Sequence, residues 1–238
     1  MRFKALLALL LGLLIAGPLA AQTFITSPPP PPAMEPENTL YLDLTSGGRV
    51  TIQLRPDVAP GHVARIKELT RKGFYDGLLF HRVIEGFMAQ AGDPRGDGTG
   101  GSDLPDLAAE FNGLPHTRGA LGMARTMEPN SANSQFYIML VPRLAMDGKY
   151  TVFGRVVAGM NFVDSIERGE PPVNPTRIAR ASIGSDNIAP LTAAELAAAA
   201  AIPLRAPPPP PVEAPPAPAT TPPDAAAAAP ADAAPATS

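Results

Sequence analysis

Short stretches in which apolar and polar residues alternate recur through the middle of the chain. Residues 40–44 and 50–54 alternate on either side of a Ser-Gly-Gly turn, which predicts a β-hairpin. Residues 80–83 and 87–90 alternate around a Glu-Gly turn, which predicts a second pair of strands. Further strands are predicted at residues 121–124, 135–140, 152–157 and 178–183.

Two other stretches have helical spacing. Apolar residues recur every three to four positions from Pro60, a residue favoured in a first helical turn, to Gly73, which would end the helix. The charged residues between them, Arg65 included, are expected to face solvent. A second helix is predicted at residues 159–168. Many short strands with two helices predict a mainly β fold, a closed eight-stranded antiparallel barrel capped by two helices.

The two ends of the chain have a different character. Residues 1–21 carry a basic start, an apolar run and then small residues, which is the layout of a secretory signal peptide cut after Ala20 or Ala21. The apolar run is short for a membrane span, although an uncleaved anchor is the alternative. We expect an exported protein, most simply a periplasmic one, that touches a membrane only if this segment is retained.

Proline-rich composition marks two more segments. Residues 22–37 read as a linker and residues 189–238 as an Ala/Pro-rich disordered tail, in which residues 192–202 could form a turn or two of helix. Each is a spacer or, alternatively, a docking site for a partner that binds proline-rich strands. One domain of ordinary size remains between them, at residues 38–188.

Composition excludes several kinds of chemistry. The chain has no cysteine, which rules out disulfides, Cys-based zinc sites and thiol catalysis. Its net charge of -3 comes from the tails, and the central domain has no basic stripe, so no nucleic-acid partner is expected. His62, His81 and His116 are too dispersed to predict a metal site, and His81 is expected to point away from Arg82 as a structural residue. We expect a monomer.

One run of residues suggests a site. Arg82, Phe87, Met88 and Gln90 lie within nine positions, and the strand pattern turns them toward a common surface. An arginine above apolar side chains can grip an apolar ring while donating hydrogen bonds to the adjacent backbone. Taken singly, the apolar residues would be ordinary core and Arg82 would form a buried salt bridge with an acidic loop residue.

The order of several blocks resembles the cyclophilin-type peptidyl-prolyl cis-trans isomerases. The resemblance covers residues 38–183 and neither tail, and it implies an eight-stranded barrel, no metal, no cofactor, and proline-containing polypeptides as substrates. The matching blocks are Phe80 to Asp93, Gly98 to Gly101, Glu110 and Phe111, Gly119 to Arg125, Asn133 to Ile138, and Met146 to Gly154.

The resemblance also implies roles for particular residues. Arg82 and Gln90 would be catalytic, and Gln90 and Gln135 would brace Arg82 and bond the substrate backbone. Main-chain contacts to the residue before proline would come from Ala124 and Arg125. The remaining substrate-binding residues would be Phe87, Met88, Tyr137 and Met146, which line the proline pocket, and Tyr150, which stands where the best-known eukaryotic members have a histidine.

Physical chemistry agrees with such a site. Rotation about an X-Pro bond has a barrier of about 18–20 kcal/mol and makes or breaks no bond to another atom. The catalyst therefore needs no nucleophile, only a donor aimed at the twisted amide, an apolar pocket and backbone contacts. Arginine suits the donor role because it is always charged and presents its N–H groups in a fixed fork.

The leading hypothesis is an exported isomerase that assists folding of other exported proteins. The alternative is a proline-binding scaffold or holdase with little catalysis. Ala145 stands where the eukaryotic members have a tryptophan, which should not abolish isomerisation because the proline pocket remains. It predicts weak or no inhibition by cyclosporin A, and a submicromolar inhibition constant would contradict that expectation.

Overall fold

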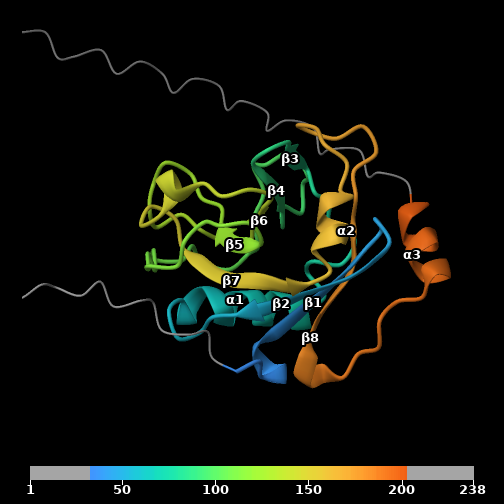
Figure 1. Cartoon of the computed structure of the whole chain (residues 1–238), viewed down its shortest axis with the longest axis horizontal. Helices are drawn as coiled ribbons and strands as arrows, with labels where there is room; N and C mark the ends of the chain where they lie inside the picture. The colour runs from blue at the N-terminus through green and yellow to red at the C-terminus, as the bar shows by residue number, and fades with distance from the viewer. Residues whose placement is uncertain (1–32, 203–238) are drawn as a thin grey trace, which may run out of the picture. The chain divides into compact units, whose positions relative to one another are not determined.

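The computed structural model describes residues 33–202. Eight strands form one antiparallel sheet in the order β3-β4-β6-β5-β7-β2-β1-β8 (Figure 1). The strands are β1 (Thr39–Leu44), β2 (Gly48–Leu54), β3 (Arg82–Ile84), β4 (Met88–Ala91), β5 (Ala120–Met123), β6 (Phe136–Met139), β7 (Val152–Ala158) and β8 (Ile178–Ile183). All the strands predicted from alternation are confirmed, with ends that shift by a residue or two.

The sheet is an open half-barrel, so the predicted closed barrel is wrong. Its edge strands β3 and β8 are not joined by a ladder (Figure 1). The segment that precedes β8 approaches β3 and the chain before it instead, through two isolated bridges, Leu79 with Arg177 and Val83 with Gly169. Because β3 has only three residues and this irregular segment occupies its free side, no regular pairing closes the sheet.

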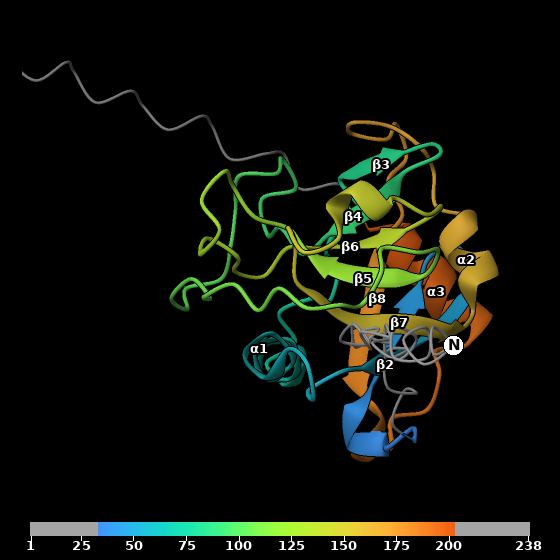
Figure 2. The same cartoon turned by 60° about the vertical axis from the view of Figure 1, so that its left-hand side comes forward.

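Helix α1 (Pro60–Arg71) has the predicted limits, and its first turn is capped from a distance. The Glu110 carboxylate accepts hydrogen bonds from the backbone N–H groups of Gly61 and His62. The expectation that Arg65 faces solvent is wrong, because its side chain is buried and donates to the carbonyls of Pro105 and Asn133. In Figure 2 the helix is seen end-on beside β2.

The other helices are short. Helix α2 (Met160–Asp164) covers only the first half of its predicted range, and the Arg168 guanidinium donates to the Asp164 carbonyl at its end. Helix α3 (Ala193–Ala200) lies within the region predicted as tail and opens with a capping box formed by Thr192 and Glu195. The segments 1–32 and 203–238, which contain the predicted signal peptide and most of the predicted linker and tail, are outside the described residues.

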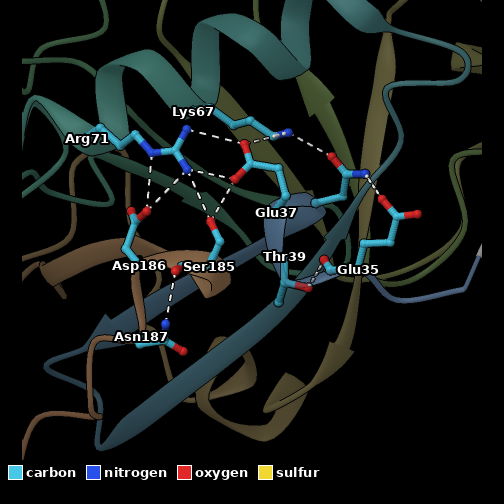
Figure 3. A network of polar contacts seen from close by, with 9 residues as sticks. Glu35, Glu37, Thr39, Lys67, Arg71, Ser185, Asp186 and Asn187 are labelled. Atoms are coloured by element: carbon cyan, nitrogen blue, oxygen red, sulfur yellow. Dashed lines mark hydrogen bonds and ion pairs between the residues drawn. The ribbon is translucent and has the colours of Figure 1, made fainter.

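Both ends of the central domain are attached to α1 by a polar network (Figure 3). The 3-10 helices η1 (Pro36–Asn38) and η3 (Gly184–Asp186) present Glu37 and Asp186 to the guanidinium of Arg71, at 2.8 Å and 3.2 Å. The Arg71 hydrogen bond, with help from Ser185 and Lys67, lowers the pKa of Glu37 to about 2. Glu37, assigned to the linker from sequence, therefore packs with the domain.

The central strands are buried on both faces, and their alternate residues belong to two separate apolar clusters. The larger cluster fills the inner face and includes Phe136 and Ile138 of β6. The smaller cluster lies on the outer face and includes Met139 of β6 and Val152 of β7. Since successive side chains of a strand point to opposite faces, one set of strands supports both clusters.

Candidate active site

The outer face carries a row of residues that are direct cross-strand partners. Arg82 of β3 pairs with Gln90 of β4, Gln90 pairs with Tyr137 of β6, and Tyr137 pairs with Gly122 of β5. Directly opposed residues on neighbouring antiparallel strands point to the same face. The hairpin register therefore places a guanidinium, an amide and an aromatic ring side by side, as the alternation in the sequence predicted for Arg82 and Gln90.

The Tyr137 ring is fixed in place from two directions. It lies over Gly122, where an added Cβ would come within 2.2 Å of the Tyr137 hydroxyl. That hydroxyl lies 2.9 Å from Nε2 of His116, whose Nδ1 lies 2.8 Å from Oδ1 of Asp147. The carboxylate selects the tautomer in which Nδ1 donates to Asp147 and Nε2 accepts from Tyr137. Burial raises the pKa of Tyr137, so the hydroxyl stays protonated.

The predicted pocket residues come together around this ring. Met88 and Tyr137 are buried in the outer cluster, with Phe87 and Met146 packed against it. Met146 is adjacent to Asp147, so the His116 contact also positions this wall of the pocket. The structure thus brings together four residues from three separate segments of the chain into one apolar surface.

Arg82 lies at the rim of the site and is less buried than the sequence suggested. Its side chain is 42 % exposed, and its Nε donates to Oε2 of Glu170 at 2.7 Å. Neither Gln90 nor Gln135 bonds Arg82 in this structure, so the expected bracing is absent. A salt bridge with an acidic loop residue does form, although it is exposed.

The two glutamines bond each other and a loop instead. Gln90 donates to Oε1 of Gln135 at 2.9 Å, and Gln135 donates to the carbonyls of Gly98 and Gly100. Both belong to the lining of a groove of about 690 Å³ that also includes Ala124 and Arg125. Because the Ala124 N–H already donates to the Gln135 carbonyl, Ala124 can offer a substrate only its own carbonyl oxygen.

The far side of the site is formed by stacked side chains. The Arg125 guanidinium lies 4.5 Å from the centre of the Tyr150 ring and donates to the carbonyls of Thr126 and Lys149. Tyr150 in turn meets the Tyr137 ring edge to face. Ala145, next to Met146 in the chain, is exposed and adds no large apolar surface to the site.

Sequence reasoning missed several residues that shape the site. His116 and Asp147 were not connected because they are 31 positions apart and meet only through the fold. Glu170 lies 88 positions from Arg82. Gly122 had a usable signal, since a glycine inside a strand often marks the close approach of another group.

No group of three or more His, Asp or Glu side chains among residues 33–202 could hold a metal ion. None of the helices in this part of the chain is long and apolar enough to cross a membrane. His62 and His81 are buried away from the row, His62 against Glu110 at the start of α1.

Comparison with known proteins identifies the family. Residues 41–183 match the family described as cyclophilin type peptidyl-prolyl cis-trans isomerase/CLD. The chain belongs to this family. A probable peptidyl-prolyl cis-trans isomerase of Brucella suis is 50% identical over 170 residues, which span 65% of this chain and 86% of the relative. Peptidyl-prolyl cis-trans isomerase B of Bacillus subtilis is 42% identical over 56% of this chain and 92% of its own length.

Solved structures agree with this assignment. Cyclophilin AquaCyp293 from Hirschia baltica has a TM-score of 0.60 and 32% identity, over 64% of this chain and 76% of that chain. A cyclophilin from Cryptosporidium parvum has a TM-score of 0.57 and 26% identity, over 61% of this chain and 98% of that chain. Our chain is therefore a cyclophilin-type enzyme whose activity is peptidyl-prolyl cis-trans isomerisation.

Proposed function

We propose that Arg82 drives rotation about X-Pro bonds whose proline ring rests on Phe87, Met88, Tyr137 and Met146. The observation that carries this proposal is the cross-strand row from Arg82 through Gln90 to Tyr137. Strands lie about 4.8 Å apart, so two strand spacings separate the arginine from the aromatic floor. An arginine side chain is long enough to reach an amide held above that floor.

The row meets the demands of the reaction. Rotation weakens the conjugation of the amide and leaves a lone pair on the proline nitrogen, which an N–H donor stabilises. A hydrogen bond to a charged group contributes about 1.5–3 kcal/mol, and each ~1.4 kcal/mol of selective stabilisation gives a tenfold rate gain. The pocket supplies the rest by holding the ring still while the chain on the other side of the bond turns.

Proline-containing polypeptides are the proposed substrates. The Cryptosporidium parvum cyclophilin was crystallised in the presence of the dipeptide Ala-Pro. This observation supports a proline-containing ligand for the present chain. The polar groove beside Gln90 and Gln135 would take the chain before the proline, with the Ala124 carbonyl as an acceptor.

Turnover of a proline peptide by Arg82 variants tests this role. Arg82→Ala should lower kcat by about 100-fold, as the loss of a preorganised donor does in other enzymes. The fold should persist, because the side chain is half exposed. Arg82→Lys should recover little, since an ammonium lacks the planar fork. Wild-type turnover by a folded Arg82→Ala protein would contradict the assignment.

We further propose that the enzyme is exported and acts on other exported polypeptides. Support comes from the amino-acid pattern of residues 1–21. The test is expression of the full chain in a Gram-negative host, followed by fractionation and N-terminal sequencing. A periplasmic protein that begins at Ala21 or Gln22 is expected. A cytoplasmic protein that keeps residues 1–21 would contradict it.

A further inference from the structure

The segment before β8 lies against β3 in a fixed register. The Val83 N–H donates to the Gly169 carbonyl at 2.8 Å, and the Gly169 N–H donates to the Val83 carbonyl at 2.9 Å. In an antiparallel pair, the residue after Gly169 lies opposite the residue before Val83. Glu170 is therefore the cross-strand neighbour of Arg82 and extends the row on the side away from Gln90.

The contact between these two residues is specific. The Arg82 Nε donates to the Glu170 carboxylate at 2.7 Å, the length of a good charge-assisted bond. Among residues 33–202 neither side chain makes another hydrogen bond. The carboxylate thus holds one edge of the guanidinium, from the side of the row away from Gln90 and Tyr137, and leaves both Nη groups uncommitted.

The segment that carries Glu170 is held independently of this contact. Gly169 has a φ of +151°, and a Cβ there would meet the backbone of Pro172 at 2.5 Å, so a side chain would be strained at this position. Arg168 forms an ion pair with Glu85 at 2.7 Å. The Glu167 carboxylate accepts from the Asn174 N–H. Glu170 is presented to Arg82 by the backbone around it.

We propose that Glu170 is a positioning residue for isomerisation, a role that rests on the catalytic role proposed for Arg82. An exposed arginine samples many rotamers, and ordering it during the reaction would raise the barrier. Holding Nε beforehand keeps both Nη groups aimed over the pocket, so less conformational freedom is lost when the amide twists. Because the effect appears in the transition state, it acts on kcat more than on KM.

A double-mutant cycle on the full chain tests this, with exchange spectroscopy on an Ala-Pro-containing peptide as the assay. Glu170→Ala should lower kcat about three- to fivefold, the range an exposed ion pair supports, and leave KM within about twofold. The kcat of Glu170→Gln, which keeps an acceptor without the charge, should lie between that of the wild type and that of Glu170→Ala. In the Arg82→Ala background, Glu170→Ala should have no further effect.

Glu68→Ala is the matched control, because it removes an exposed carboxylate that pairs with Lys72 at the end of α1 and touches neither Arg82 nor the segment around Glu170. Its kcat should equal that of the wild type. The Nε–Hε resonance of Arg82 gives a readout that a structural role would not move. It should be protected from solvent exchange in the wild type and in Glu68→Ala, and lose that protection in Glu170→Ala.

Four results would overturn the proposal. Unchanged kcat in Glu170→Ala would show that Arg82 needs no such partner, and a raised kcat would show that Glu170 competes with the substrate. An equal loss in the wild-type and Arg82→Ala backgrounds would place the effect in the fold. Full turnover by Arg82→Ala would instead refute the catalytic role of Arg82, and the positioning role with it.

Discussion

The two faces of strands β4 and β6 differ in what they do. On the inner face, Ala89 and Ile138 are cross-strand partners in the large cluster that holds the half-barrel together. On the outer face, one residue along, Gln90 and Tyr137 are partners in the row that forms the site. Because successive side chains alternate between the faces, this one pair of short strands serves stability with one set of side chains and chemistry with the other.

The faces also differ in kind of side chain. The inner face is apolar throughout, whereas the outer face combines flexible Met88 with residues whose polar ends are bonded elsewhere, Gln90 to Gln135 and Tyr137 to His116. Methionine adapts its shape to a ligand, and bonded polar ends keep the rest of the surface fixed. Changes to the inner face should therefore act on folding, and changes that displace the rings or amides of the outer face should act on substrate handling.

The largest effect on stability is expected from the inner face. Ile138 is fully buried, so Ile138→Ala should lower the free energy of unfolding by about 2–5 kcal/mol through lost burial and a cavity. The kcat/KM of the molecules that stay folded should remain near the wild-type value. Urea denaturation and turnover at matched folded fraction check this. A large loss of turnover per folded molecule would contradict the division between the faces.

Gly122→Ala should disturb the outer face directly. The new Cβ would come within 2.2 Å of the Tyr137 hydroxyl, which cannot move freely because it is buried and bonded to His116. Stability should fall by about 1–3 kcal/mol from overpacking, and KM should rise as the ring leaves the pocket floor. Gly113→Ala is the control, since nothing lies within 4 Å of its Cβ position. Equal KM values in the two variants would argue against the pocket.

Tyr137→Phe should affect stability and leave turnover nearly unchanged. It keeps the ring and removes the hydroxyl, which leaves Nε2 of buried His116 without its partner. We expect a loss of about 1–3 kcal/mol in the free energy of unfolding and little change in kcat/KM. Chemical denaturation beside the turnover assay checks both. A drop in kcat comparable to that of Arg82→Ala would mean that the hydroxyl takes part in the reaction.

His81, the neighbour of Arg82, should act on the pH dependence of stability and not on catalysis. Burial lowers the pKa of His81 below its ordinary value, against the opposing effect of Asp93. The unfolded chain therefore binds a proton that the folded one does not, and stability falls as pH drops below about 6.5 by up to ~1.4 kcal/mol per unit. His81→Gln should flatten this slope, although buried His62, with a similarly lowered pKa, keeps part of it. An unchanged slope would show that His81 is not the source.

Much of this could be predicted from sequence because the information is local. Alternation around Gly86 fixes the hairpin, and the hairpin register alone places Arg82 opposite Gln90. The order of the motif blocks adds the distant members of the pocket, Tyr137 and Met146. Each of these follows from neighbouring residues or from a family pattern.

The remaining features depend on segments far apart in the chain. The open sheet arises because the segment ending at Arg177 occupies the free side of β3. That segment has no hydrophobic periodicity from which this position could be predicted. The contact of this segment with β3 also brings Glu170 beside Arg82, although the two residues are 88 positions apart. Arg65 looks like a surface residue on its helix, and only the fold shows the two loop carbonyls that accept its hydrogen bonds.

The central claim is that the pocket holds the proline and Arg82 turns the bond. Exchange spectroscopy on a proline peptide measures both at once, because binding shifts the peptide signals and catalysis adds cis–trans exchange peaks. For the Arg82→Ala protein we predict that the binding shifts persist while exchange slows about 100-fold. Exchange at the wild-type rate in this variant would contradict the claim.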